Sequence, residues 1–277
     1  MARSVVSQAD KARAFRALHA RDRAFIIPNP WDPGTARLLA TLGFEALATT
    51  SAGYAFSQGV RDGEVDRDTM LAHVAAIVAA TDLPVSADLE NGFGDDPDSA
   101  AETIRAAAAT GLAGGSIEDV SRGPDGRIYE IAHAADRVRA AAEAARSLRA
   151  PFTLTARAEN FLHGRPDLAD TIARLQAFQD AGADVLYAPG LRTTDEIGTT
   201  VRAVDRPVNV LVGLQGAQLD LATLSSLGVK RVSVGSALTR AALGAFLRAA
   251  REMRDHGTFA FAEDAVSYKE ISAMLAP

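Results

Sequence analysis

Short apolar runs alternate with longer amphipathic segments along almost the whole chain. Runs of this length are typical of the buried strands of a parallel sheet, and the longer segments, with apolar residues at a helical spacing, are typical of helices that cover such a sheet. The pattern predicts eight strands, at residues 25–28, 45–50, 84–88, 114–118, 152–156, 184–188, 207–212 and 231–234.

Helices are expected in the intervals between these strands. The main ones are predicted at about residues 34–42, 67–80, 99–110, 133–148, 167–181 and 241–254. Asp32 ahead of Pro33 has the chemistry of a helix N-cap, whereas the polar, Gly-containing stretch 51–66 is predicted to be a loop. Eight strand–helix units without a flexible linker favour one (β/α)8 TIM barrel domain over residues 1–277, rather than a doubly wound open sheet.

Both ends of the chain carry helical patterns beyond what a barrel needs. Residues 1–22 form a charged amphipathic pattern, and residues 261–277 form an extra C-terminal helical segment. Spare terminal helices usually pack on a neighbouring subunit or on the flank of the barrel. We therefore expect an oligomer contact at the C-terminal segment, and a monomeric mass in solution would contradict it.

The composition is that of an ordinary globular protein, with 48% hydrophobic and 23% charged residues. A formal net charge of -6 without a basic cluster argues against nucleic acid as a partner. The chain has no Cys, which excludes disulfides, zinc–thiolate sites and thiol nucleophiles. No signal peptide and no apolar run of membrane-spanning length is present, so we expect a cytoplasmic protein without a membrane partner.

Acidic residues follow three of the predicted strands. Asp62 lies in the loop after the second strand, Asp88 and Glu90 follow the third, and Glu118 ends the fourth. A barrel gathers these strand ends on one face, and residues i and i+2 of a strand share a side. The set suits Mg²⁺, with Mn²⁺ as an alternative, held directly by Asp88 and through water by the other three. A solvated acidic turn is the competing interpretation.

The positions of the basic residues narrow the classes of reaction that the chain could catalyse. The only lysines are Lys11, Lys230 and Lys269, and Lys230 precedes the eighth strand, at the wrong end of a barrel for a Schiff base. Arg157 and Glu159 follow the fifth strand, and Arg157 is the one base adjacent to the acids. His163 alone among five histidines falls in a loop at the same end; a lone loop His is more often exposed than catalytic.

Five motifs, taken in order, resemble the isocitrate lyase and phosphoenolpyruvate mutase superfamily. They are TSAGYAFSQGVRD, DLENGFG, IED, TARAENF and VSYKEI, at residues 50–62, 88–94, 117–119, 155–161 and 266–271. The resemblance runs from about Asn29 to the C-terminus. It implies a (β/α)8 barrel with Mg²⁺ at its top, assembled as a homodimer or homotetramer, with the eighth helix swapped between subunits.

The resemblance also implies roles for individual residues. Asp88 would be the main metal carboxylate, and Asp62, Glu90 and Glu118 would act largely through water. Thr50, Ser51 and Ala52 would bind a substrate carboxylate and oxyanion through backbone N–H groups. Arg157 would pair with a substrate carboxylate or phosphonate, a task that suits its planar fork of donors. Asn209, within the seventh predicted strand, is a further candidate for substrate binding.

The chain departs from the family pattern in three places. Residues 88–92 read Asp-Leu-Glu-Asn-Gly where the family often has Asp-x-Asp-Thr-Gly, which changes the reach of the second acid. The loop at 120–130 has neither the Lys-Lys-Cys-Gly-His motif of isocitrate and methylisocitrate lyases nor the Lys and Asn of mutases and phosphonopyruvate hydrolases. Pro189 stands where mutases have a His.

These departures leave the proton-handling group open. With Arg157 and Glu118, the catalytic candidates are Arg122 and Tyr187. Arg127 and Tyr129 are further substitutes, and all four of these replacements are also ordinary loop or packing residues.

The leading hypothesis is a Mg²⁺-dependent lyase or decarboxylase that cleaves a C–C bond of a small α-keto or 2-hydroxy (di)carboxylic acid through an enolate. A phosphonopyruvate hydrolase or a mutase-type P–C bond enzyme is the alternative within enzymes. A relative that binds a dicarboxylate without turnover is the alternative outside them.

Overall fold

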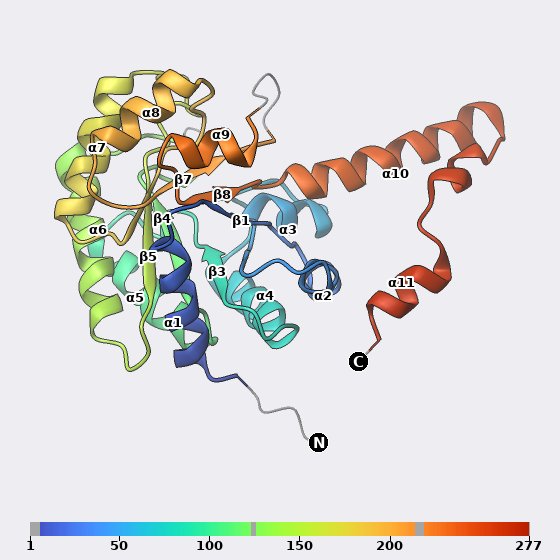
Figure 1. Ribbon diagram of the computed structural model, residues 1–277, viewed down its shortest axis with the longest axis horizontal. Helices are drawn as coiled ribbons and strands as arrows, with labels where there is room; N and C mark the ends of the chain where they lie inside the picture. Colours follow the sequence, from blue (N-terminus) through green and yellow to red (C-terminus); the bar gives the residue numbers. More distant parts are fainter. Residues whose placement is uncertain (1–5, 123–125, 214–218, 277) are drawn as a thin grey trace.

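Eight parallel strands form a nearly closed (β/α)8 TIM barrel in the computed structural model, which describes residues 6–122, 126–213 and 219–276 (Figure 1). The strands are β1 Phe25–Ile27, β2 Leu47–Ala48, β3 Val85–Asp88, β4 Gly114–Glu118, β5 Thr153–Arg157, β6 Val185–Tyr187, β7 Val208–Leu211 and β8 Arg231–Ser233. Their order around the sheet is β1-β8-β7-β6-β5-β4-β3-β2. The prediction of eight strands in a barrel is confirmed.

The barrel meets itself between β1 and β2. The N–H of Ala48 donates to the carbonyl of Pro28 at 3.1 Å across this seam. Asn29 spans the same place, because its Nδ2 donates to the carbonyl of Thr49 and its Oδ1 accepts from the N–H groups of Val234 and Gly235. One buried amide side chain therefore joins β2 and the end of β8 to the end of β1.

Helices alternate with the strands and cover the barrel. They are α1 Gln8–His19, α2 Pro33–Thr41, α3 Ser51–Ser57, α4 Arg67–Ala79, α5 Pro97–Ala109, α6 Ile131–Arg146, α7 Leu168–Asp180, α8 Thr194–Arg202, α9 Leu221–Ser226, α10 Ala237–His256 and α11 Tyr268–Met274, with a 3-10 turn, η1, at Ala260–Asp264. Asp32 caps α2 as expected, in a capping box with Thr35.

Two local predictions were wrong. Residues 51–57, expected as loop, form α3, because the side chain of Thr50 accepts from the N–H of Gly53 and so caps a helix. Strand β2 has two residues where six were expected. Propensity does not reveal either feature, since both depend on contacts around the barrel end.

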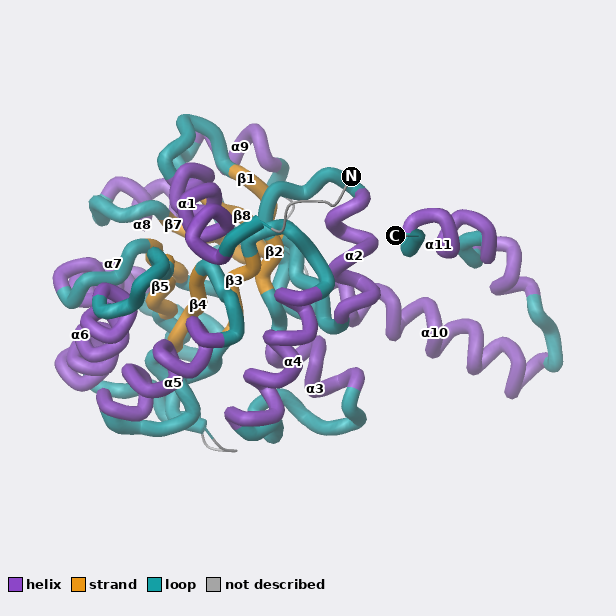
Figure 2. The backbone as a smooth tube through the Cα atoms, turned by 90° about the horizontal axis from the view of Figure 1, so that it is seen from below, coloured by secondary structure: helices purple, strands orange, loops and turns teal. Residues whose placement is uncertain are grey.

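Helix α1 closes the bottom of the barrel, at the N-terminal ends of the strands (Figure 2). Phe15 is fully buried there against Phe25 and His19, at ring separations of 6.4 and 4.8 Å. Polar side chains of α1 donate to backbone carbonyls that precede strands: Gln8 to Leu112 and Lys11 to Thr81. Helix α1 is thus a plug for the bottom of the barrel, apolar at its centre and hydrogen-bonded at its edge.

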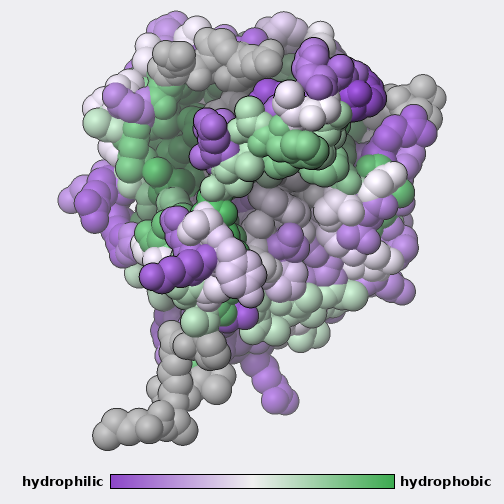
Figure 3. Space-filling view, turned by 90° about the vertical axis from the view of Figure 1, so that its right-hand side faces the viewer, coloured by the Kyte–Doolittle hydropathy of each residue, from purple (hydrophilic) through white to green (hydrophobic). Residues whose placement is uncertain are grey.

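The C-terminal helices α10 and α11 form an arm that projects from the barrel (Figure 1). Only Thr239 of α10 is buried, and α11 touches the barrel near α2, where Arg37 donates to the carbonyl of Leu275. Hydrophobic side chains gather on the side of the molecule that carries the arm (Figure 3). The large exposed ones on the arm are Leu238, Leu243, Phe246, Leu247, Met253, Phe259, Val266 and Tyr268. None of the described helices is long and apolar enough to cross a membrane.

Candidate active site

A cavity of about 360 Å³ opens at the C-terminal ends of the strands. The main metal, substrate-binding and catalytic candidates from the sequence all line it. These are Thr50, Ser51, Ala52, Asp62, Asp88, Glu90, Glu118, Arg122, Arg157, Tyr187 and Asn209. The barrel thus brings together residues that lie up to 159 positions apart in the chain, and their individual roles stay predictions.

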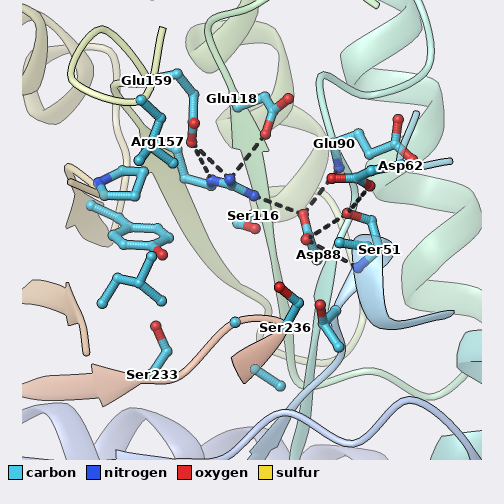
Figure 4. Close-up of a pocket in the computed structure, with 18 of the residues that line it drawn as sticks. Ser51, Asp62, Asp88, Glu90, Ser116, Glu118, Arg157, Glu159, Ser233 and Ser236 are labelled. Atoms are coloured by element: carbon cyan, nitrogen blue, oxygen red, sulfur yellow. Dashed lines mark hydrogen bonds and ion pairs between the residues drawn. The ribbon is translucent and has the colours of Figure 1, made fainter. Parts of the chain in front are cut away.

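Asp88 ends β3 and contacts Arg157 and Ser51 (Figure 4). Its Oδ1 accepts from Nη1 of Arg157 at 2.8 Å. Its Oδ2 lies 3.0 Å from Oγ of Ser51 and 3.2 Å from the N–H of the same residue. The Ser51 hydroxyl is also 3.1 Å from Asp62, so one hydroxyl proton lies between two carboxylates. Burial, and then the charge of Asp88, raise the pKa of Asp62.

Glu90 reaches the cavity by a route that strand alternation does not describe. Strand β3 ends at Asp88, and Glu90 has φ 49°, in the left-handed region that non-glycine residues rarely adopt. Its Oε2 pairs with Nε of Arg122 at 3.0 Å, whereas its buried Oε1 has no hydrogen-bond partner among the described residues. Burial raises the pKa of Glu90 to about 7, although Arg122 opposes the shift. The expected convergence occurs, but the i, i+2 reasoning behind it was wrong.

Arg157 at the end of β5 is the cation of the site. Its guanidinium contacts Asp88 at 2.8 Å, Glu118 at 3.1 Å and Glu159 at 2.7 Å (Figure 4). Burial alone would lower the pKa of Arg157, but these carboxylates raise it well above its ordinary value. Burial disfavours the charged form of Glu118 and raises its pKa, although the positive charge of Arg157 opposes this shift. One positive charge therefore neutralises part of the charge of three carboxyl groups, of which Glu159 is buried and Asp88 and Glu118 are partly buried.

Glu159 lines the cavity and contacts Arg157, although no role was predicted for it. It lies two residues beyond Arg157, and its N–H donates to Oδ1 of Asp119 at 2.8 Å. Asp119 faces away from the cavity and pairs with the buried Arg174 at 3.0 Å. Asp119 thus fixes the backbone that carries Glu159, and Glu159 in turn holds the guanidinium of Arg157. The motif TARAENF contains the signal, because it places an acid two residues after the base.

The opposite wall of the cavity, formed by β6 to β8, is nearly free of acids. Tyr187 lies beside Arg157, with the guanidinium carbon 5.3 Å from the ring centroid, and burial raises the pKa of Tyr187 to about 12. Because its pKa is raised, Tyr187 keeps its phenolic proton at neutral pH. On the same wall, Asn209 donates to Oγ of Ser233 at 2.9 Å and accepts from Nε of Arg231 at 2.9 Å.

The other substitute candidates divide into two groups. Arg122 donates to the carbonyls of Gly63 and Val65, so it ties the loop after β4 to the loop after α3. Tyr129 lies outside the cavity and donates to Asp95 at 2.6 Å, which makes it a packing residue, and Arg127 is exposed. His163 is exposed at the cavity rim, as expected. Residues 123–125 of this loop lie outside the described residues.

The donor set fits a hard divalent cation. Its acidic side chains offer only oxygen ligands, and the buried Oε1 of Glu90 has no hydrogen-bond partner among the described residues. Within residues 6–122, 126–213 and 219–276, no three acidic or histidine side chains lie close enough to bind one ion together. An ion here would take few direct carboxylates and complete its coordination with water, which is the habit of Mg²⁺.

Comparison with known proteins identifies the family. The model of the phosphoenolpyruvate phosphomutase family matches residues 15–254. The chain belongs to this family. The resemblance noted from the motifs, to the superfamily that joins phosphoenolpyruvate mutase with isocitrate lyase, is thereby confirmed.

Proteins with similar sequences have varied names. A protein of Mycobacterium tuberculosis (strain ATCC 25618 / H37Rv) described as uncharacterised is 34% identical over 265 residues, which are 95% of this chain and 96% of that protein. The probable 2-methylisocitrate lyase 2 of Corynebacterium glutamicum is 28% identical over 263 residues, 92% and 84% of the two chains. The oxaloacetate decarboxylase of Chromohalobacter salexigens is 28% identical over 258 residues, 90% and 87% of the two chains.

Solved structures agree with the fold. A crystal structure of a Burkholderia cenocepacia J2315 protein is 64% identical, with a TM-score of 0.94 over 98% of this chain and 97% of the other. A phosphonopyruvate hydrolase in complex with oxalate and Mg²⁺ is 25% identical, with a TM-score of 0.83 over 95% and 94% of the chains. Proteins similar to this chain thus carry the names of a lyase, a decarboxylase and a phosphonopyruvate hydrolase.

Proposed function

We propose that this protein is a Mg²⁺-dependent lyase or decarboxylase acting on a small α-keto or 2-hydroxy (di)carboxylic acid. The observation that carries the proposal is one cavity in which four carboxylates and Arg157 meet at the C-terminal ends of the strands. The relatives named 2-methylisocitrate lyase and oxaloacetate decarboxylase support the substrate class.

Asp88 would hold the ion directly, with Asp62, Glu90 and Glu118 acting through water; Mn²⁺ would serve in its place. Bound there, the ion would polarise the oxygens of the substrate and stabilise the negative charge that develops as the C–C bond breaks.

The side chains of this protein supply orientation and protons. Arg157 presents a planar guanidinium, held by Glu159 and Glu118, to a substrate carboxylate. Tyr187 lies against Arg157 on the wall formed by β6 to β8 and carries a proton at neutral pH, so it can donate to a carbanion or oxyanion that forms beside it. Arg122 joins the loops on either side of Glu90 and would exclude water from that side of the cavity.

The decisive experiment is a turnover screen of α-keto and 2-hydroxy acids with Mg²⁺, comparing wild type with Asp88→Ala. We expect Asp88→Ala to lower kcat/KM by at least about 10²-fold, because it removes the group that places the charge-stabilising ion. Asp98→Ala is the matched control, since Asp98 is an exposed acid beyond the same strand. Unchanged Mg²⁺ binding and turnover in Asp88→Ala would refute the proposal.

P–C bond cleavage is the second candidate, favoured by the family match itself and by the phosphonopyruvate hydrolase neighbour. Incubation with phosphonopyruvate, followed by phosphorus NMR, would reveal phosphate release or rearrangement. The loop after β4 argues against this candidate, because it lacks the Lys and Asn of those enzymes. Binding of oxalate with Mg²⁺ but no turnover of any acid would instead identify a non-catalytic dicarboxylate-binding protein.

We also propose that the arm formed by α10 and α11 mediates a homodimer or homotetramer. Its exposed hydrophobic side chains, among them Phe246 and Phe259, are more than an isolated helix in water would retain. Light scattering should give a multiple of 29.0 kDa, and Phe246→Asp should shift the mass towards the monomer. A wild-type mass of one chain would contradict this.

A further inference from the structure

One buried arginine of the cavity has no acidic partner. Arg231, the first residue of β8, is 5% exposed and lines the cavity wall. Its Nε donates to Oδ1 of Asn209 at 2.9 Å, and its Nη1 has no hydrogen-bond partner among the described residues. A guanidinium carries five N–H donors, so much of its hydrogen-bonding capacity is unused.

The other arginines that are buried or largely buried have more partners than Arg231. Arg157 meets three carboxylates, and Arg174 meets Asp119 and Asp170 at 3.0 and 2.8 Å. Arg137 lacks a carboxylate but donates to the backbone carbonyls of Asn91, Gly94 and Glu118. Arg231 has one neutral oxygen as a partner, and its electrostatic neighbours are Tyr187, which favours the charged form, and Arg157, which repels it.

Burial and that repulsion lower the pKa of Arg231 to about 10, so the side chain is still charged at neutral pH. An unpaired buried charge is costly for the folded protein, and proteins usually pair it or neutralise it. No Asp or Glu of the described chain does so here. A bound anionic ligand that pairs with Arg231 would explain why the folded protein keeps this unpaired charge.

The place of Arg231 in the cavity specifies that anion. The carboxylates lie on β3 and β4 and in the loops after α3, β3 and β5, whereas Arg231 belongs to β8, on the opposite wall, with Asn209 of β7 and Ser233. The two walls thus have opposite electrostatic character. A substrate whose carboxylate and keto or hydroxyl oxygens face the acidic wall would extend any second acidic group towards the other.

We propose that Arg231, oriented by Asn209, forms a subsite for the second carboxylate of a dicarboxylic substrate. This deepens the proposed function and rests on it, because it selects dicarboxylates from the acids considered there. Because Asn209 is neutral, it does not neutralise the positive charge of Arg231, which can pair with a ligand carboxylate. The planar fork of donors of a guanidinium also suits a carboxylate.

The test compares malate with lactate, which differs from malate in lacking the second carboxylate. Binding of each acid with Mg²⁺ is measured by calorimetry for wild type, Arg231→Met and Arg231→Lys. Wild type should prefer malate, and Arg231→Met should reduce that preference by about 10- to 100-fold, as expected for a lost charge-assisted hydrogen bond. Arg231→Lys, which keeps charge but not the fork, should retain part of it.

Stability separates this role from a structural one. Since Arg231→Met removes an unpaired buried charge, its ligand-free Tm should equal or exceed that of wild type. Arg137→Met is the matched control, because it should lower the Tm without changing the malate preference. Oxalate with Mg²⁺, which needs no second subsite, should bind all Arg231 variants within about threefold of wild type.

The outcomes are distinct. Failure of oxalate to bind wild type would refute the proposed metal chemistry, whereas the malate preference tests the subsite independently. Three outcomes would overturn the subsite. The first is equal wild-type affinity for malate and lactate, and the second is an undiminished preference for malate in Arg231→Met. The third is a loss of that preference in Arg231→Met that is accompanied by a lower Tm.

Discussion

The two ends of the barrel use the same strands in opposite ways. At the bottom, α1 buries Phe15 against Phe25, and its polar side chains donate to neutral carbonyls. At the top, three carboxyl groups share Arg157, and Glu90 takes a strained backbone conformation. The bottom therefore contributes mainly stability, while the top keeps charges in an arrangement that a ligand would complete.

This contrast predicts that substitutions at the top change function with mixed effects on stability, and that substitutions at the bottom change stability alone. The following predictions test it.

The largest effect is expected for Arg157→Met. It leaves Asp88, Glu118 and Glu159 without their cation, so we expect a loss of about 3–5 kcal/mol in the free energy of unfolding, as for a broken buried pair, together with loss of turnover. Urea denaturation and the turnover screen measure both. Arg157→Lys is the matched variant and should regain much of the stability. An Arg157→Met protein as stable as wild type would show that the top does not depend on this charge.

Phe15→Ala should cost a similar free energy with no functional loss. Removing a fully buried aromatic ring typically destabilises a protein by about 3–5 kcal/mol. Because Phe15 packs under the barrel, kcat/KM per folded molecule should stay within about twofold of wild type. Denaturation and active-site titration together provide the measurement. A selective loss of kcat/KM in well-folded protein would break the division between the two ends.

The smallest effect concerns the pH dependence of the plug. Burial lowers the pKa of His19 from 6.5 to about 3, with the charge of Arg231 adding to the shift. The unfolded chain therefore binds a proton that the folded protein does not, and stability should fall as the pH falls from 6.5 towards 3. Between pH 6.5 and 4.5 the contribution of His19 is about 2–3 kcal/mol.

His19→Gln is the variant for this measurement, because an amide can still donate to the carbonyl of Phe15 as Nδ1 of His19 does. Its unfolding free energy, followed from pH 6.5 to 4.5, should decline less than that of wild type. Parallel pH profiles for the two proteins would mean that His19 does not titrate between the folded and unfolded states.

Sequence alone indicated the barrel and most of the cavity, because strand periodicity and acids at strand ends are local signals. It did not indicate the conformation of Glu90, whose positive φ depends on the turn that follows β3. It gave Glu159 no role, since that role comes from Asp119 and Arg174, 40 and 15 residues away. Arg231 likewise became significant only when its neighbours were known, because a lack of partners is a property of the fold.

The seam between β1 and β2 gives the barrel a preferred place to open. There β2 is two residues long, and Asn29 holds the neighbouring chain ends with its single amide. Regions with few backbone hydrogen bonds are the first to exchange amide hydrogens with solvent, through local openings that leave the rest folded. Thr49 and Thr50 follow directly after β2, so the same fluctuations would transiently widen the cavity at the wall where the proposed substrate-binding backbone begins.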